Sequence, residues 1–197
     1  MKITQATFLR DVKNHQMTIL KDDGVFRCIE FRNPADRGTY FFYLTTFPGR
    51  LVISGDCGSY VFSRINDMFQ FFRGHDINPG YWSEKVDAED KRDGIEVFNT
   101  KKLKEQIVDN FNSYREHNFC DDEDCNELDD EILSVIEDEH TFVALGEKEL
   151  MCGFVLEPWE YHPYDFSPRF IWNCYAIQWG IQQYDKLKGV EYEQKQS

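Results

Sequence analysis

The first third of the chain alternates short β-type runs with turn signals. Runs rich in β-branched and aromatic residues are separated by dipeptides that contain glycine or proline. The runs are MTILK, GVFRCIEFR, GTYFFYLTTF, RLVISG and SYVF. Because Asp-Gly and Pro-Gly favour tight turns, each run should pair with the next one along the chain. The pattern predicts an antiparallel meander of four to five strands within residues 1–62.

Helical spacing of apolar residues dominates after residue 62, where positions three and four apart are repeatedly apolar. The segment after Ser167-Pro168 is the clearest helix, because serine is a good N-cap and proline suits the first helical position. We expect another long helix from Thr100, and shorter helices at 4–14, after Ser63, from Asn78 and around 128–136.

A sheet followed by helices is typical of the α+β class. We therefore predict a single α+β domain over residues 1–197, in which several C-terminal helices pack on an N-terminal antiparallel meander. Residues 1–62 should be mainly sheet and residues 63–197 mainly helical.

Negative charge is concentrated in one segment of the chain. The 197 residues include 36 acids and 22 Lys or Arg, a net charge of −14. Residues 120–140 hold eleven acids and no Lys or Arg, whereas the other 176 residues carry a net charge of only −3. A nucleic-acid backbone or an anionic membrane would be repelled by such a surface, so neither is an expected partner.

Compartment and cysteine chemistry follow from the apolar pattern. No apolar run approaches the ~20 residues that span a membrane, and MKITQATFLRDVKNH lacks a signal-type apolar core. We expect a cytoplasmic protein whose six cysteines are thiols.

The acidic segment has two interpretations. Its carboxylates can be a solvated helix face that confers solubility, or a docking surface for a basic partner. The aromatic residues near 159–166 lie in a proline-interrupted loop, and either fold back on the core or anchor a partner. As candidate partner-binding residues we take Asp121, Asp122, Glu123, Asp124, Glu127, Asp129, Asp130, Glu131, Glu137, Asp138, Glu139, Trp159 and Tyr161.

The stretch GDCGS around Cys57 resembles the nucleophile loop of chymotrypsin-like cysteine proteases. That arrangement needs a histidine and an acid on a preceding β-barrel, but only 56 residues and His15 precede Cys57. We therefore interpret the stretch as a glycine turn between two strands. No nucleotide-binding loop, serine-hydrolase motif or zinc-protease motif is present in the sequence, and we predict no catalytic residue.

Metal binding is the other chemistry that the sequence leaves open. His117, Cys120, Cys125 and His140 have H-x2-C and C-x4-C spacing that a structural zinc site can use. Asp122, Asp124 and Asn126 begin like a calcium loop, but Glu127 stands where that loop requires glycine. We predict no cofactor and assign no metal ligand, with zinc at the first set as the open alternative.

The segments TFPGRLVISGDCGSYVFSRINDMFQFFR and FSPRFIWNCYAIQWGIQQYD resemble parts of uncharacterised small proteins of enteric phages and prophages. That family brings no established activity or site residues. The resemblance implies a context, since small acidic accessory proteins of such genomes often bind and disable a host machine. CRISPR effectors, restriction enzymes and recombination nucleases are examples of such targets, and several of these inhibitors mimic nucleic acid.

Resemblance and charge together predict a non-enzymatic, phage-encoded binding protein. It would inhibit a host nucleic-acid-handling defence or repair complex, in the manner of an anti-CRISPR or anti-restriction protein. Its partner would be the basic surface of that complex, engaged by an acidic surface that mimics nucleic acid. The alternative is a small metal- or cysteine-dependent enzyme with a site assembled from dispersed residues such as Cys57, His75, Asp56 and His162.

Overall fold

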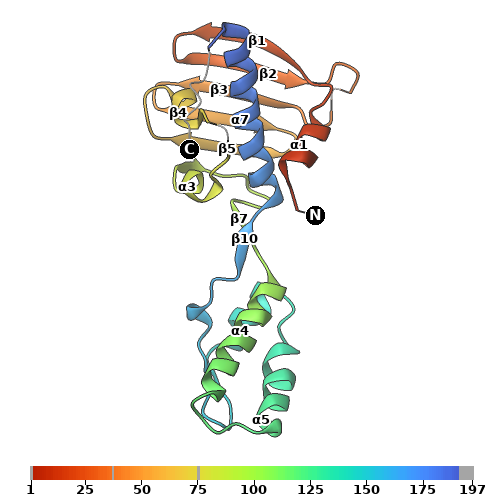
Figure 1. Cartoon of the computed structure of the whole chain (residues 1–197), viewed down its shortest axis with the longest axis vertical. Coiled ribbons are helices and arrows are strands. Elements are labelled where there is room, and N and C mark those ends of the chain that lie inside the picture. The colour runs from red at the N-terminus through yellow and green to blue at the C-terminus, as the bar shows by residue number, and fades with distance from the viewer. Residues whose placement is uncertain (1, 37, 75, 191–197) are drawn as a thin grey trace. The chain divides into compact units, whose positions relative to one another are not determined.

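The computed structural model describes residues 2–36, 38–74 and 76–190, and the chain forms two compact units (Figure 1). Unit 1 comprises residues 1–95 and 166–197, and unit 2 comprises residues 96–165. The sequence predicts a single domain over residues 1–197. In the structure, unit 2 is inserted in the chain between the two parts of unit 1.

Unit 1 is built on a six-stranded antiparallel sheet in which strands adjacent in sequence are adjacent in the sheet. The strands are β1 (Gln16–Asp23), β2 (Phe26–Arg32), β3 (Phe42–Phe47), β4 (Arg50–Gly55), β5 (Gly58–Ser63) and β6 (Val86–Ala88). The predicted α+β class and the meander are confirmed. Strand β6 was not predicted, because three residues are too few to show a period.

One face of this sheet is buried. In β2, Ile29 and Phe31 are fully buried. The residues that alternate with them, Cys28, Glu30 and Arg32, are partly exposed. Alternate residues of a strand point to opposite faces, so this pattern separates a packed face from an open one. The same alternation continues through β3, β4 and β5.

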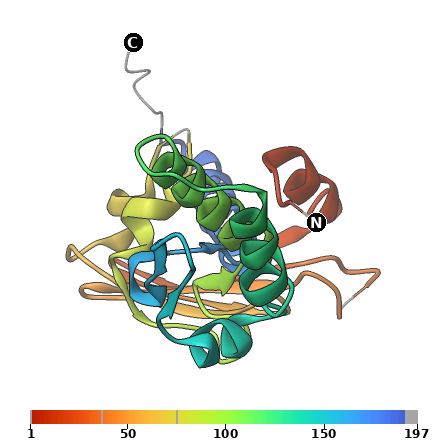
Figure 2. The same cartoon turned by 90° about the horizontal axis from the view of Figure 1, so that it is seen from below.

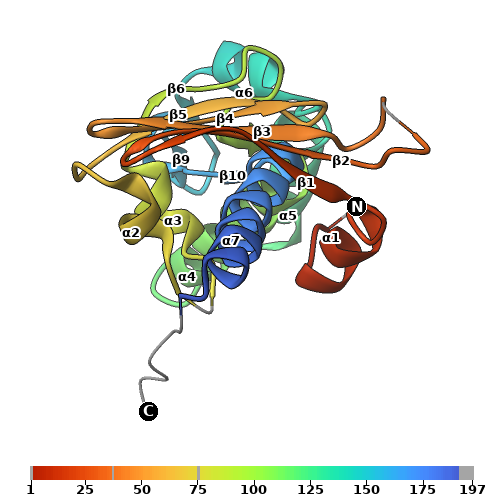
Figure 3. The same cartoon turned by 90° about the horizontal axis from the view of Figure 1, so that it is seen from above.

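The helices of unit 1 cover the buried face. They are α1 (Gln5–Asp11), α2 (Met68–Phe72), α3 (Pro79–Ser83) and α7 (Pro168–Lys188). Figure 3, which views the sheet edge-on, shows α1, α2 and α7 on the same side of it. Helix α7 begins as predicted, with the Ser167 hydroxyl accepting a hydrogen bond from the Phe170 N–H. It ends at Gly189, whose left-handed conformation suits glycine.

The start of α2 differs from the prediction. The sequence predicts a helix directly after Ser63, but the Ser63 N–H donates to the Lys85 carbonyl and the residue remains in β5. The cap is Asp67, whose carboxylate accepts a hydrogen bond from the Phe69 N–H.

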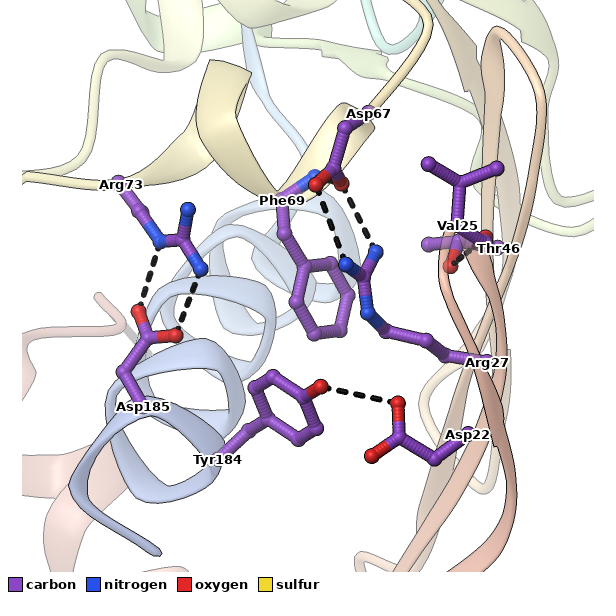
Figure 4. A network of polar contacts seen from close by, with 9 residues as sticks. All are labelled: Asp22, Val25, Arg27, Thr46, Asp67, Phe69, Arg73, Tyr184 and Asp185. Carbon is purple, nitrogen blue, oxygen red and sulfur yellow. Dashed lines mark hydrogen bonds and ion pairs between the residues drawn. The ribbon is translucent and has the colours of Figure 1, made fainter. Parts of the chain in front are cut away.

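Two ion pairs fix α2 and α7 in unit 1 (Figure 4). Arg27 of β2 is buried and donates two hydrogen bonds, of 2.8 and 3.1 Å, to the Asp67 carboxylate. Arg73 follows α2 and donates two, of 2.8 and 2.7 Å, to Asp185 of α7, which is fully buried. Paired donors of this kind match the carboxylate geometry and set the orientation of both side chains.

Gly55 at the end of β4 lies against the neighbouring strand. A Cβ at this position would lie 2.1 Å from the Phe41 carbonyl oxygen. Because the clashing atom belongs to the backbone, no side-chain movement can remove this clash. We expect Gly55→Ala to lower the free energy of unfolding by about 1–3 kcal/mol, measured by denaturant unfolding. The control is Gly80→Ala in α3, where the Cβ would lie 4.0 Å from Asn78 Oδ1, and the change should be neutral or stabilising. Equal effects of the two variants would contradict the clash.

Unit 2 is mainly helical and has its own core. Its elements are β7 (Glu96–Phe98), α4 (Thr100–Arg115), α5 (Asp122–Glu127), η1 (Leu128–Leu133), α6 (Glu139–Leu145), β8 (Lys148–Glu149), β9 (Val155–Leu156) and η2 (Pro158–Glu160). Strand β10 (Tyr164–Phe166) pairs with β7 where the chain enters and leaves the unit. Helix α4 and the α5–η1 segment lie side by side (Figures 1 and 2) and share a core that includes Ile107, Phe111 and Ile132.

The segment 128–136 is not the regular α-helix that the spacing predicts. Residues 128–133 form a π-helical turn, in which the Ser134 N–H bonds to the Asp129 carbonyl at 2.8 Å. The wider turn keeps Ile132 and Ile136 buried but leaves Val135 exposed. Among the described residues, no helix combines the length and hydrophobicity needed to cross a membrane.

Candidate partner-binding site

Unit 2 accounts for all of the protein's net negative charge. Residues 96–165 contain 20 acids and five Lys or Arg, a net charge of −15. The rest of the chain contains 16 acids and 17 Lys or Arg, a net charge of +1. The charge imbalance is therefore wider than the predicted segment 120–140 but is confined to one unit.

The eleven predicted acids are close to the surface, and six of them have a structural task. Nine are exposed, while Asp124 and Glu127 are half-buried. Asp121, Asp124 and Asp138 cap helices through backbone N–H groups. Glu127 accepts a hydrogen bond from the Met151 N–H, Glu131 pairs with Lys148, and Glu139 accepts one from the Tyr164 hydroxyl.

Five of the acids remain available to a partner. Their side chains make no hydrogen bond or ion pair with another residue that the structure describes, and all five are exposed. They are Asp122, Glu123, Asp129, Asp130 and Glu137. Some carboxylates of the acidic segment thus stabilise helix ends, and the others face solvent.

The α5–η1 segment carries a high density of carboxylates. Eight acids lie in residues 121–131, and the backbone stays helical through Glu127 and Leu128. At ~1.5 Å of rise per helical residue, this is about one carboxylate per 2 Å of axis. Duplex DNA carries one charge per ~1.7 Å, so the two densities are similar.

An apolar pocket of about 470 Å³ lies within unit 2. It is lined by Phe98, Glu139, Phe142, Val143, Gly146, Pro158, Trp159, Tyr161, Pro163 and Tyr164. Three predicted partner-binding residues, Glu139, Trp159 and Tyr161, therefore meet at one site. The sequence showed each of them but not their grouping, because they come from separate elements joined only by the fold.

The two predicted aromatic residues differ in exposure. Tyr161 folds back onto Phe142, with ring centroids 6.1 Å apart, and its hydroxyl accepts a hydrogen bond of 3.2 Å from Asn110. Trp159 of η2 is 67% exposed, and Val143, which also lines the pocket, is 65% exposed. Large exposed apolar side chains in a concave site are typical of a binding surface.

Carboxylates border this pocket. The hydrogen bond from the Tyr164 hydroxyl to Glu139, 2.6 Å long, raises the pKa of Tyr164. Next to Pro158, burial together with the neighbours Glu160 and Glu147 raises the pKa of Glu157. Like charges held this close raise the pKa of a carboxyl because they disfavour its ionised form, and a cation placed there would relieve the repulsion.

Cys57 lies in a tight turn, as predicted. Asp56 and Cys57 join β4 to β5, with Gly55 opposite Gly58 in the register. Burial, followed by the neighbouring Asp56, raises the pKa of the Cys57 thiol to about 12. A nucleophilic cysteine needs a lowered pKa, so this environment does not favour a reactive thiolate.

Of the other residues of the enzyme alternative, Asp56 shares the turn with Cys57. Asp56 accepts a hydrogen bond of 2.8 Å from the Tyr40 N–H in unit 1. His162 belongs to unit 2, where its ring nitrogen lies 3.6 Å from a Glu96 carboxylate oxygen. His75 lies outside the described residues.

The four ligands suggested by zinc-type spacing are not grouped. His117 contacts the Ser113 carbonyl, and Cys125 Sγ accepts a hydrogen bond of 3.0 Å from Arg115. Cys120 instead lies with Asp124 and Cys152, in the one group of potential metal ligands found among the described residues. The calcium-type stretch from Asp122 forms helix α5 and not a loop.

Comparison with protein-family models, with curated proteins and with solved structures finds no match. The function must therefore be inferred from the chain's own residues.

Proposed function

We propose that this chain is a non-enzymatic binding protein whose unit 2 occupies the basic, nucleic-acid-binding surface of a host defence or repair complex. The observation that carries the proposal is the confinement of a net charge of −15 to residues 96–165, beside an exposed aromatic pocket. An inhibitor of the anti-CRISPR or anti-restriction type fits this description, with phage origin as the context that the resemblance implies.

Charge density supports a mimic of nucleic acid. The carboxylates of the α5–η1 segment approach the linear charge density of a duplex, so Lys and Arg that bind phosphates can bind them. At physiological salt, charges are screened beyond ~8 Å, so the acids must lie at the interface itself. The five exposed acids without a structural task are the ones that can lie at such an interface.

The pocket supports a partner of defined chemistry. We propose that it receives an apolar side chain of the partner that is flanked by Lys or Arg. The aromatic lining around Trp159 would bury the apolar part, and the acids Glu139, Glu157 and Glu160 would attract the flanking cations. Apolar anchors surrounded by charge are a common design of protein interfaces.

A charge-reversal experiment tests the proposal. Tagged full-length protein captures partners from a lysate of an enteric bacterium, and captured proteins are eluted with salt and identified by mass spectrometry. The expected partner is a stoichiometric nucleic-acid-handling complex that elutes between about 0.2 and 0.5 M salt and is displaced by duplex DNA. We expect reversal of Asp129, Asp130 and Glu137 to Lys to weaken binding about tenfold to hundredfold.

The matched control reverses Asp23, Asp76 and Glu84, three exposed acids of unit 1, which changes the net charge by the same amount. Binding should stay within about twofold in this variant, because charges away from the interface act only weakly. Equal loss in both variants, or a partner indifferent to salt and to DNA, would overturn the proposed function.

A further inference from the structure

Three potential metal ligands meet in unit 2 although they are distant in the sequence. The Sγ atoms of Cys120 and Cys152 and a carboxylate oxygen of Asp124 all lie within 4.8 Å of one another. Each of the three residues is half-buried. This group is separate from the aromatic pocket, whose lining contains none of the three.

The start of α5 and the β8–β9 turn hold the three potential metal ligands in place. Cys120 directly precedes Asp121, the N-cap of α5, and Asp124 is in the first turn of that helix. Cys152 is in the turn between β8 and β9, which is closed by a hydrogen bond of 2.9 Å from the Leu150 N–H to the Phe154 carbonyl. The Tyr114 hydroxyl donates to the Cys152 carbonyl at 2.9 Å and holds the tip of this turn.

We propose that Cys120, Asp124 and Cys152 bind a zinc ion, with water in the fourth position. Two sulfur ligands and one carboxylate suit zinc, whereas calcium and magnesium require oxygen ligands. Binding converts both thiols to thiolates and releases their protons to solvent. Because the ligands span α5 and the β8–β9 turn, the ion ties the acidic helix to the hairpin.

Asp124 is already oriented for this task. Its carboxylate accepts a hydrogen bond of 2.8 Å from the Asp121 N–H in the capping box. Hydrogen bonds of this kind fix the direction of a metal ligand. The ligand set differs from the one that sequence spacing suggested, since Cys120 alone is common to both and His117, Cys125 and His140 are not involved.

Cobalt titration of the reduced, full-length protein tests the site. We expect one equivalent of Co²⁺ to produce the thiolate-to-cobalt and visible bands of a tetrahedral thiolate site, and zinc to remove them. Cys152→Ser should weaken the metal affinity at least about 100-fold, since it removes a direct ligand. Asp124→Asn keeps both thiols and should still shift the visible bands.

Cys125→Ser is the matched control, because Cys125 is also half-buried and adjacent to Asp124 but outside the group. Its metal affinity should stay within about twofold of the wild type. Circular dichroism of the metal-free variants checks that each one folds. Absence of the thiolate band in the folded wild type would overturn the proposal, as would an affinity that Cys152→Ser leaves unchanged or that Cys125→Ser abolishes.

Discussion

Replacing Arg73 with methionine is expected to lower the free energy of unfolding by about 3–5 kcal/mol. The change removes both hydrogen bonds that Arg73 donates to Asp185, a carboxylate with no exposed surface in α7. Removing one member of a buried ion pair is costly, because the charge that remains has lost its hydration and is less well stabilised than in the pair. Urea unfolding followed by circular dichroism measures the change.

Arg50→Met is the matched control for this variant. Arg50 pairs with Asp87 at 3.0 Å, but both side chains are more than 40% exposed. Water and salt screen such a pair, so the loss should be below about 1 kcal/mol. A similar loss in the two variants would show that the stability of unit 1 does not depend on the buried position of Asp185.

Replacing Trp159 with alanine is expected to weaken partner binding by about 30- to 1,000-fold, as for a central interface residue worth 2–4 kcal/mol. Trp159 contributes the largest exposed aromatic surface to the pocket of unit 2. The free energy of unfolding should change by less than about 1 kcal/mol, because a side chain that is mostly exposed contributes little to the core. Titration of the captured partner with purified protein measures the affinity.

Phe119→Ala separates a site effect from a general loss of apolar surface. Phe119 is 88% exposed, belongs to the same unit and does not line the pocket. Its replacement should leave the affinity within about twofold of the wild type. Retained affinity in Trp159→Ala, with the partner still bound through the acids, would restrict the proposed interface to the charged helix.

Local signals determined which parts of the fold the sequence could predict. The Ser167 cap, Pro168 and Gly189 define α7 because each acts on its own backbone. Strand β6 depends instead on antiparallel pairing with β5, in which Val61 lies opposite Ala88. The α2 cap depends on a residue of β2, since Arg27 holds Asp67. Such long-range contacts leave no periodic trace in the sequence.

The candidate sites show the same division. The acids of 121–139 stand out in composition, and their exposure follows from their charge. The pocket around Trp159 and the approach of Cys120 to Cys152 both require segments that meet only after folding. Spacing therefore suggested Cys125 as a partner of Cys120, whereas the structure brings in a cysteine from the β8–β9 turn.

Insertion of unit 2 between β6 and α7 has an evolutionary consequence. The buried core of the sheet and its helices draws on residues up to Trp82 and from Phe170 onward, and the core of unit 2 draws on residues from Leu103 to Leu156. Because none of the buried residues that the structure describes belongs to both cores, substitutions that change the charge of one unit do not require repacking of the other. A lineage can therefore remodel the acidic insert by surface substitutions while the unit that carries it stays constant.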